Sequence, residues 1–151
     1  MSDTRNPRAH TGYLVRRAQQ RHVSLWSRMV SADTSSVQFS ILVALDRRPE
    51  SSQRELCEEV DLDRSTIADL LSRMERRGLL SRSRAAEDGR RNVVTLTPDG
   101  ATELERLRPL VDRADAELTV ALAPEELEAL QHGLRQILTH PTNTEHDDAE
   151  D

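Results

Sequence analysis

The sequence predicts a mainly α-helical fold with one small β-hairpin. Apolar residues recur at helical spacing over most of the 151-residue chain. Two short runs with strand-like composition, residues 79–84 and 92–96, are joined by a polar loop that contains the turn pair Asp88-Gly89. The chain has one Trp, one Tyr and one Phe, so its core must be aliphatic. An aliphatic core suits packed helices better than a β-sandwich.

The N-terminal third is predicted to form two helices. Residues 1–8 are polar and are expected to be disordered. A helix with one apolar side then runs from about residue 9 to residue 31, where a Ser-Ala-Asp-Thr stretch breaks it. A second helix follows and ends at Arg48-Pro49, because the residue before a proline disfavours helical backbone angles.

Residues 52–97 are predicted to form a helix, a tight turn, a second helix and then the hairpin. Ser52 and Glu55 have the spacing of a capping box, in which each side chain bonds the free backbone donor of the other. Asp63 is the predicted N-cap of the second helix, and Gly78 is its left-handed end. This order defines a winged helix-turn-helix, a module that usually binds duplex DNA.

Two more helices are predicted after the hairpin, beginning at Thr97-Pro98 and Ala123-Pro124. The helices at the two ends, residues 9–31 and 98–139, carry more apolar surface than a single chain of this size can cover. We therefore expect a homodimer that these helices join, with residues 9–139 forming one domain in each chain. Residues 140–151 form an acidic tail that is expected to be disordered.

The charge is unevenly distributed. The net charge is −6, but five acidic residues lie in the tail after His140. Between Arg73 and Arg91 there are seven arginines and three acidic residues, a local charge of +4. This local charge decides what binds there, because charges more than ~10 Å apart are largely screened. All 21 basic residues are arginine, which suits phosphate and guanine but which an arginine-biased genome would equally explain.

The predicted second helix and hairpin tip supply candidate DNA contacts. The helix exposes short polar side chains and arginines to the major groove, and the tip presents arginines that can enter a minor groove. The candidates are Arg64, Ser65, Thr66, Arg73, Arg90 and Arg91, with Asp88 placed to orient the guanidinium of Arg90. The alternative is an amphipathic surface helix and an ordinary charged hairpin, whose arginines only keep the protein soluble.

These residues resemble those of MarR-family transcriptional regulators, and the resemblance covers roughly residues 12–138. The run Asp88–Thr97 fits the family's wing pattern D-x-R-x5-L-T at every position. The stretches Asp63–Thr66 and Leu71–Leu79 are similar to the family's recognition helix. The resemblance implies a homodimer on a pseudo-palindromic operator, with Arg90 in the minor groove and Ser65, Thr66 and Arg73 facing the major groove. It also implies that the protein regulates transcription, more often as a repressor than as an activator.

The first predicted helix is similar to family members that control aromatic-acid catabolism. This resemblance implies an effector that is a small anionic aromatic molecule, either an acid or its thioester. An arginine can pair with the carboxylate while aromatic rings provide flat walls. The candidate ligand-binding residues are Tyr13, Arg16, Arg17, His22 and Trp26. Alternatively, His22 and Trp26 pack at the dimer interface, and the arginines pair with acidic residues of the second chain.

Other function classes receive little support. Cys57 is the only cysteine, so no intramolecular disulfide can form, and its place on the apolar side of a short helix favours a structural role over a redox switch. The five histidines have no metal-binding spacing, and no nucleophile or phosphate-loop motif is present, so neither a cofactor nor an enzyme is expected.

The absence of a long apolar run predicts no membrane span and a cytoplasmic location. Two other functions remain open: a winged-helix module that binds proteins, and a DNA-binding protein without an effector.

Overall fold

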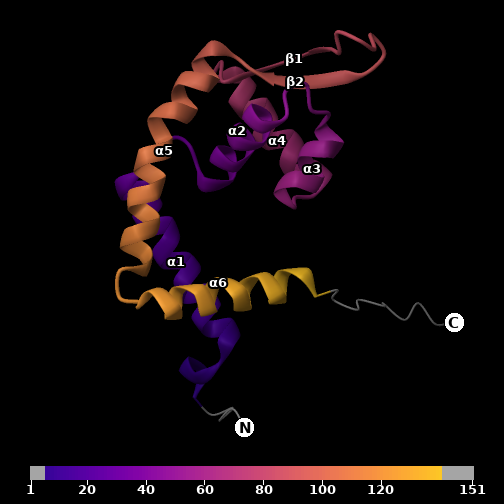
Figure 1. The fold of residues 1–151 in the computed structure, drawn as a ribbon. Coiled ribbons are helices and arrows are strands. Elements are labelled where there is room, and N and C mark those ends of the chain that lie inside the picture. The colour runs from indigo at the N-terminus through magenta and orange to yellow at the C-terminus, as the bar shows by residue number, and fades with distance from the viewer. Residues whose placement is uncertain (1–5, 141–151) are drawn as a thin grey trace, which may run out of the picture. The chain divides into compact units, whose positions relative to one another are not determined.

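The computed structural model describes residues 6–140. The chain divides into two compact units, Met1–Leu118 and Thr119–Asp151, and each is described by itself. The elements are a 3-10 helix η1 (Pro7–Ala9), then α1 (Thr11–Met29), α2 (Ser36–Arg47), α3 (Gln53–Val60), α4 (Arg64–Arg76), β1 (Leu80–Arg84), β2 (Asn92–Leu96), α5 (Pro98–Thr119) and α6 (Pro124–Thr139). The predicted mainly helical winged helix-turn-helix is confirmed (Figure 1).

The structure describes part of the N-terminal segment but not the acidic tail. Pro7 and Arg8, which were predicted to be disordered, belong to η1, where the side chain of Asn6 accepts a hydrogen bond from the backbone N–H of Arg8. The first five residues and the predicted acidic tail after His140 lie outside the described residues.

The core of the first unit is aliphatic, as the composition predicts. Side chains from α2, α3, α4, the hairpin and α5 meet there, and Trp26 of α1 and the following Val30 join the same cluster. The largest side chains with almost no exposed surface are Ile41, Leu42, Leu45, Leu56, Ile67, Leu71, Met74, Leu80, Leu104 and Leu107. Burying a side chain of this kind contributes about 1.5–3 kcal/mol, so this cluster fixes how α4 and the hairpin sit on the other elements.

Local hydrogen bonds set the helix ends at the places that the sequence predicts. Ser52 and Glu55 form the predicted capping box at the start of α3. Asp63 caps α4, and Gly78 has a φ of 74°, the left-handed conformation that ends the helix. A second capping box, Ser35 with Gln38, starts α2 and was not predicted.

The hairpin is antiparallel, with a register that runs from Leu80 opposite Leu96 to Arg84 opposite Asn92. The backbone N–H of Val94 also donates to the carbonyl oxygen of Ser51, 2.8 Å away. Ser51 immediately precedes the capping box of α3. The helix-turn-helix and the hairpin are therefore joined through their backbones as well as through the core.

The start of α5 packs closely against the junction between α4 and β1. The backbone N–H of Thr97 donates to the carbonyl oxygen of Leu79 at 3.2 Å, and the hydroxyl of Thr97 donates to the carbonyl oxygen of Gly78. An ideal Cβ built on Gly100 would lie 1.8 Å from the same Leu79 oxygen. Gly100 is therefore required by this close backbone approach.

The second unit contains α6. The sequence predicts an inward apolar side for this helix, but none of its described residues is buried in the single chain. Leu130, Leu134, Ile137 and Leu138 are 39–79% exposed. Among all the helices that the structure describes, α6 included, none is both long enough and apolar enough to cross a membrane.

Candidate functional site

The first turn of α4 is held by the carboxylate of Asp63. One carboxylate oxygen accepts hydrogen bonds from the backbone N–H groups of Ser65 and Thr66, both at 2.9 Å. The hydroxyls of Ser65 and Thr66 also donate to this carboxylate, each at 2.6 Å. These bonds, led by those from the two hydroxyls, hold the pKa of Asp63 well below its usual range, so the side chain stays ionised.

This cap changes what the start of α4 can offer to a ligand. Ser65 and Thr66 are exposed, as predicted for residues that face DNA. Free backbone N–H groups at the start of a helix can bind a phosphate. Asp63 already occupies both of these groups, so a phosphate near this turn would be held by side chains such as Arg64.

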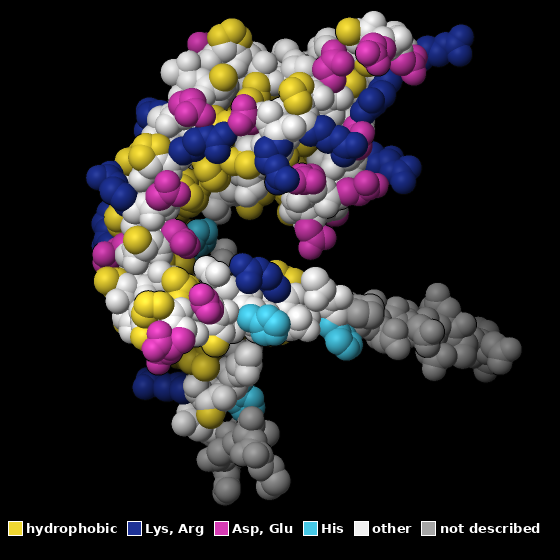
Figure 2. Space-filling view, viewed as in Figure 1, with side chains coloured by type: hydrophobic (Ala, Val, Ile, Leu, Met, Phe, Trp, Pro, Cys, Tyr) yellow, Lys and Arg dark blue, Asp and Glu magenta, His cyan; other side chains and the backbone are white. Residues whose placement is uncertain are grey.

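Three arginines of α4 and the hairpin tip, two of them predicted DNA contacts, have no acidic partner among the described residues. Within residues 6–140, no acidic side chain pairs with the guanidinium of Arg64 or Arg76 on α4, or of Arg90 at the hairpin tip. All three are exposed. Figure 2 shows arginine side chains over the helices below the hairpin and at its outer end, with acidic side chains among them. The three unpaired charges are therefore available to an external anion.

Arg73 of α4 and Arg77, the C-cap of that helix, bind within the protein. The guanidinium of Arg73 pairs with Asp69 at 2.6 Å. Arg77 donates to the carbonyl oxygen of Asp33 at 2.8 Å and to the hydroxyl of Thr34 at 3.0 Å. The structure thus places Arg77 against the loop between α1 and α2.

Asp88 and Arg84 fix the backbone of Arg90. The sequence predicts that Asp88 orients the guanidinium of Arg90, but its side chain instead accepts from the backbone N–H of Arg90 at 3.1 Å. On the other side, Arg84 donates to the carbonyl oxygen of Arg90 at 2.9 Å. A turn closed by a 3.0 Å bond from the backbone N–H of Arg91 to the carbonyl oxygen of Asp88 completes the tip. The backbone of Arg90 is thus held while its side chain stays exposed.

Arg91, predicted as a DNA contact, forms an ion pair with Glu55 of the α3 capping box. The same carboxylate accepts from the backbone N–H of Ser52 at 2.7 Å. The backbone N–H and the hydroxyl of Ser52, and then Arg91, lower the pKa of Glu55 to about 2. Arg91 therefore ties the hairpin to α3, a role that the sequence did not predict.

We expect replacement of Glu55 by Gln to reduce the acid sensitivity of folding. The pKa of Glu55 is about 2 in the folded protein, against an ordinary 4.5. Its charge therefore stabilises the fold above pH 4.5, and this stabilisation is lost as the pH falls from 4.5 towards 2. Glutamine can still close the capping box but has no charge to protonate. Urea unfolding at several pH values in this window should show a smaller fall in unfolding free energy for Glu55→Gln than for the unchanged protein.

The matched control for that experiment is Glu58→Gln, on the same helix. Glu58 is 66% exposed and pairs only with Arg54 within the described chain, so its substitution should leave the pH dependence nearly unchanged. An equal pH dependence in Glu55→Gln and the unchanged protein would show that the Glu55 carboxylate does not stabilise the fold.

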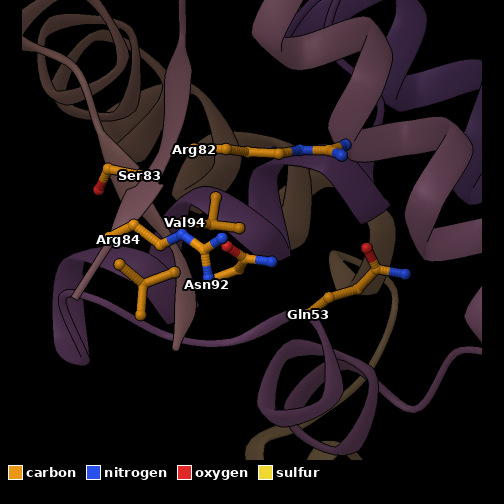
Figure 3. A pocket seen from close by; sticks show the side chains of 7 residues that line it. Gln53, Arg82, Ser83, Arg84, Asn92 and Val94 are labelled. Atoms are coloured by element: carbon orange, nitrogen blue, oxygen red, sulfur yellow. The ribbon is translucent and has the colours of Figure 1, made fainter. Parts of the chain in front are cut away.

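A groove of 520 Å³ lies between the start of α3 and the hairpin. Its walls are formed by Gln53, Arg82, Ser83, Arg84, Asn92, Val93 and Val94. Figure 3 shows Arg84 and Asn92, which face each other across the strand pair, on the hairpin wall, and Gln53 on α3. These walls carry guanidinium, amide and hydroxyl groups but no carboxylate. Such a lining suits a phosphate group, which would lie next to the start of α3 and the hairpin.

A second cavity, of 430 Å³, lies where α1 meets α2 and α4. Its walls are formed by Val23, Trp26, Ser27, Ser31, Ala32, Asp33, Ser35, Ser36, Gln38, Leu70, Arg73 and Arg77. Trp26 is the one predicted ligand-binding residue among them, and its indole N–H donates to the carbonyl oxygen of Thr34 at 2.7 Å. The ring of His22 lies 5.9 Å from that of Trp26.

The remaining predicted ligand-binding residues lie earlier on α1. The guanidinium of Arg16 lies over the ring of Tyr13 at 5.2 Å, and Arg17 donates to Gln20 at 3.4 Å. Arg16 precedes Trp26 by ten residues, which is about 15 Å along a helix. The structure thus separates the five candidates into two groups. Arg73 and Arg77 also line the cavity, and no local sequence pattern predicts this position for them.

The described residues give little support to a redox site or a metal site. Cys57 is partly buried on α3. Among the residues that the structure describes, no three histidine, cysteine, aspartate or glutamate side chains come together as a metal site would require.

The known sequences that are similar to this chain include several transcriptional regulators. The profile of the MarR family matches residues 32–91. The transcriptional regulator HosA of Escherichia coli is 32% identical over 124 residues, which are 82% of this chain and 91% of HosA. The HTH-type transcriptional repressor NicR of Pseudomonas putida is 32% identical over 134 residues, covering 87% of this chain and 84% of NicR.

Proteins of similar fold have been solved in complex with DNA or with a ligand. The regulator PcaV from Streptomyces coelicolor, in complex with its natural ligand, is 40% identical with a TM-score of 0.83, covering 88% of this chain and 94% of PcaV. Bordetella bronchiseptica BpsR, whose DNA binding is regulated by 6-hydroxynicotinic acid, is 29% identical with a TM-score of 0.82 over 87% and 95%. The repressor CouR bound to a 23-mer DNA duplex is 31% identical with a TM-score of 0.77 over 85% and 92%.

Proposed function

This chain belongs to the MarR family of DNA-binding transcriptional regulators and is not an enzyme, and from that premise we propose a more specific function. We propose that it is a homodimeric repressor of a pseudo-palindromic operator. Binding of a small anionic aromatic molecule releases it from that operator. A regulator of this kind works where the DNA is, which agrees with the cytoplasmic location that the sequence predicts.

The unpaired arginines are the observation that supports DNA binding most directly. Arg64 and Arg76 on α4 and Arg90 on the hairpin belong to one compact unit, and no acidic partner of the described chain neutralises them. Neighbouring arginines, by contrast, pair within the protein. A polyanion that contacts both a helix and a hairpin fits this division, and a duplex presents a major groove for α4 next to a minor groove for the tip. A protein-binding module needs no such set of unpaired charges.

Uncovered apolar surface supports the homodimer. On α1, Leu14, Val15 and Val23 are 47–55% exposed. On α6, none of the described residues is buried, although the helix has a continuous apolar side. A second copy of the chain supplies a matching surface for each of these helices. A twofold axis would then set two α4 helices one turn of DNA apart, about 34–36 Å.

The effector proposal draws on α1 and on the relatives. PcaV was solved with its natural ligand and BpsR is regulated by 6-hydroxynicotinic acid, and both are similar to this chain along most of its length. The cavity beside Trp26 offers one aromatic wall, and the ring of His22 lies next to the indole without lining the cavity. Arg16 and Arg17 remain proposed anchors for the carboxylate, with Tyr13 as a further wall, but they lie earlier on α1 and do not line this cavity. Arg73 and Arg77 already have partners, so their charges are partly satisfied.

Binding to a labelled duplex from the DNA upstream of the protein's own gene tests the proposal. We expect saturable binding of two chains per duplex, with a Kd of roughly 10 nM near physiological salt. Addition of 4-hydroxybenzoate, 6-hydroxynicotinate or a benzoyl thioester should release the duplex, and Arg16→Ala should weaken that release. Fluorescence anisotropy measures both. Affinity no higher than for a random duplex would contradict operator binding. Release by none of the compounds would leave a repressor without an aromatic effector.

A further inference from the structure

Thr34 is a polar residue in the loop between α1 and α2, and it is completely buried. All of its hydrogen-bonding groups are used. Its backbone N–H donates to the hydroxyl of Ser31 at 3.0 Å, and its carbonyl oxygen accepts from the indole N–H of Trp26 at 2.7 Å. Its hydroxyl accepts from Arg77 at 3.0 Å and donates to Glu103 at 3.1 Å. One buried residue, through its backbone and its hydroxyl, therefore links α1, the end of α4 and α5.

Arg77 is the residue through which this link reaches the DNA-reading helix. It is the C-cap of α4, and both ends of its guanidinium bond the loop, one at the carbonyl oxygen of Asp33 and one at the hydroxyl of Thr34. The loop is therefore joined to the C-terminal end of α4 through this guanidinium.

Glu103 holds the hydroxyl of Thr34 from the other side. Its carboxylate pairs with Arg106 through both oxygens, at 2.9 and 3.0 Å. The hydrogen bond from Arg106, and then that from Thr34, lowers the pKa of Glu103, so it remains an acceptor. The single hydrogen of the Thr34 hydroxyl is thus directed to Glu103, which leaves a lone pair aimed at Arg77.

The cavity of 430 Å³ is in contact with the same residues. Trp26, Asp33 and Arg77 all line it, and each is one hydrogen bond or one peptide bond away from Thr34. A molecule in this cavity must touch the loop, the indole or the guanidinium. Because Thr34 is buried and all its hydrogen-bonding groups are used, a displacement of any of these residues would strain or break one of its bonds at a cost in free energy.

We propose that Thr34 is a positioning residue that couples occupation of this cavity to the placement of the C-terminal end of α4. The proposal rests on the proposed function in that α4 is the helix that reads DNA. An occupant that is accommodated better with the loop displaced shifts the population towards chains in which Arg77, and with it α4, has moved. The shift cannot exceed the difference in the occupant's affinity for the two arrangements.

A covalent occupant tests the coupling without knowledge of the natural effector. In a Cys57→Ala background, Ser27→Cys places one thiol in the cavity wall for reaction with N-phenylmaleimide. Thr102→Cys, exposed on α5, is the matched control. Each is made with Thr34, with Thr34→Val, which keeps the shape but removes the hydroxyl, and with Thr34→Ser, which keeps the hydroxyl. Operator affinity and hydrogen exchange of the backbone amides of residues 73–78 are measured before and after labelling.

We expect the cavity label to weaken operator binding about tenfold and to speed exchange at the end of α4 severalfold when residue 34 is Thr or Ser. With Thr34→Val, the label should change either quantity less than about twofold. The label on Thr102→Cys should change neither. An equal effect of the cavity label with Thr34 and with Thr34→Val would overturn the proposal, and so would the absence of any effect with Thr34.

Two provisions keep the test decisive. Circular dichroism checks the folding of every variant, and if Thr34→Val does not fold, Arg77→Gln replaces it, because that change removes the guanidinium from the other side of the same bond. Hydrogen exchange needs no DNA. If the unlabelled protein does not bind the operator, the proposed function fails, while the exchange data still decide whether Thr34 couples the cavity to α4.

Discussion

Replacement of Arg90 by alanine is expected to weaken operator binding about 10- to 100-fold, a loss of about 1–3 kcal/mol. The backbone of Arg90 is already fixed by Asp88 and Arg84, so DNA binding need not order it. No acidic side chain of the described chain pairs with its guanidinium, so DNA does not have to displace an internal partner. The negative potential of a narrow minor groove strengthens the contact further.

A salt titration of operator affinity distinguishes this contact from a general loss of charge. The slope of log affinity against log salt concentration should fall by about 1 for Arg90→Ala, because one fewer counterion is released. Arg113→Ala, which removes an exposed arginine of α5 outside the helix-turn-helix and hairpin, is the control and should change neither affinity nor slope. If Arg90→Ala behaves like Arg113→Ala, the hairpin tip does not contact DNA.

Replacement of Gly100 by alanine is expected to destabilise the fold by about 3 kcal/mol or more. The new Cβ would lie 1.8 Å from the carbonyl oxygen of Leu79 and 2.9 Å from its carbonyl carbon. These are backbone atoms that cannot rotate away, and the oxygen also accepts the hydrogen bond from Thr97. The start of α5 would have to move off the end of α4. Thermal unfolding followed by circular dichroism should show a Tm about 6–12 °C lower.

Gly133→Ala is the matched control for this substitution. Gly133 lies within α6, and apart from its chain neighbours and the backbone of its own helix, no described atom lies within 4 Å of the position that its Cβ would take. Alanine is the better helix former, so this change should stabilise the protein by about 0.5–1 kcal/mol. Opposite signs for the two substitutions would confirm that the close approach at Gly100, and not glycine replacement in a helix, causes the loss. A Tm for Gly100→Ala equal to that of the unchanged protein would contradict the packing described for α5.

The features that could be predicted from the sequence are those whose partners are near in the chain. The capping box of Ser52 and Glu55, the cap at Asp63 and the helix end at Gly78 each depend on contacts within two to four residues. The hairpin was predicted from its turn and from two short strands for the same reason. These local signals were sufficient to place α3, α4, β1 and β2 within a residue or two of their observed bounds.

What could not be predicted depends on residues that are far apart in the chain. Arg91 and its partner Glu55 are separated by 36 residues, and Thr34 lies 43 residues from Arg77 and 69 from Glu103. An arginine looks the same in a sequence whether its side chain is paired or available. The division of the arginines into structural ones and ones free to bind an anion therefore required the fold, and so did the cavity beside Trp26.

The cap on α4 determines the direction of the hydrogen bonds that its first turn can form with a base. A hydroxyl has a single hydrogen, and those of Ser65 and Thr66 are both directed to the ionised Asp63. Each hydroxyl therefore presents only lone pairs outwards. In the major groove, the groups that donate to a lone pair are the amino groups of adenine and cytosine. We therefore expect this turn to accept hydrogen bonds from those two bases, and we expect guanine, which presents acceptors, to be contacted by Arg64.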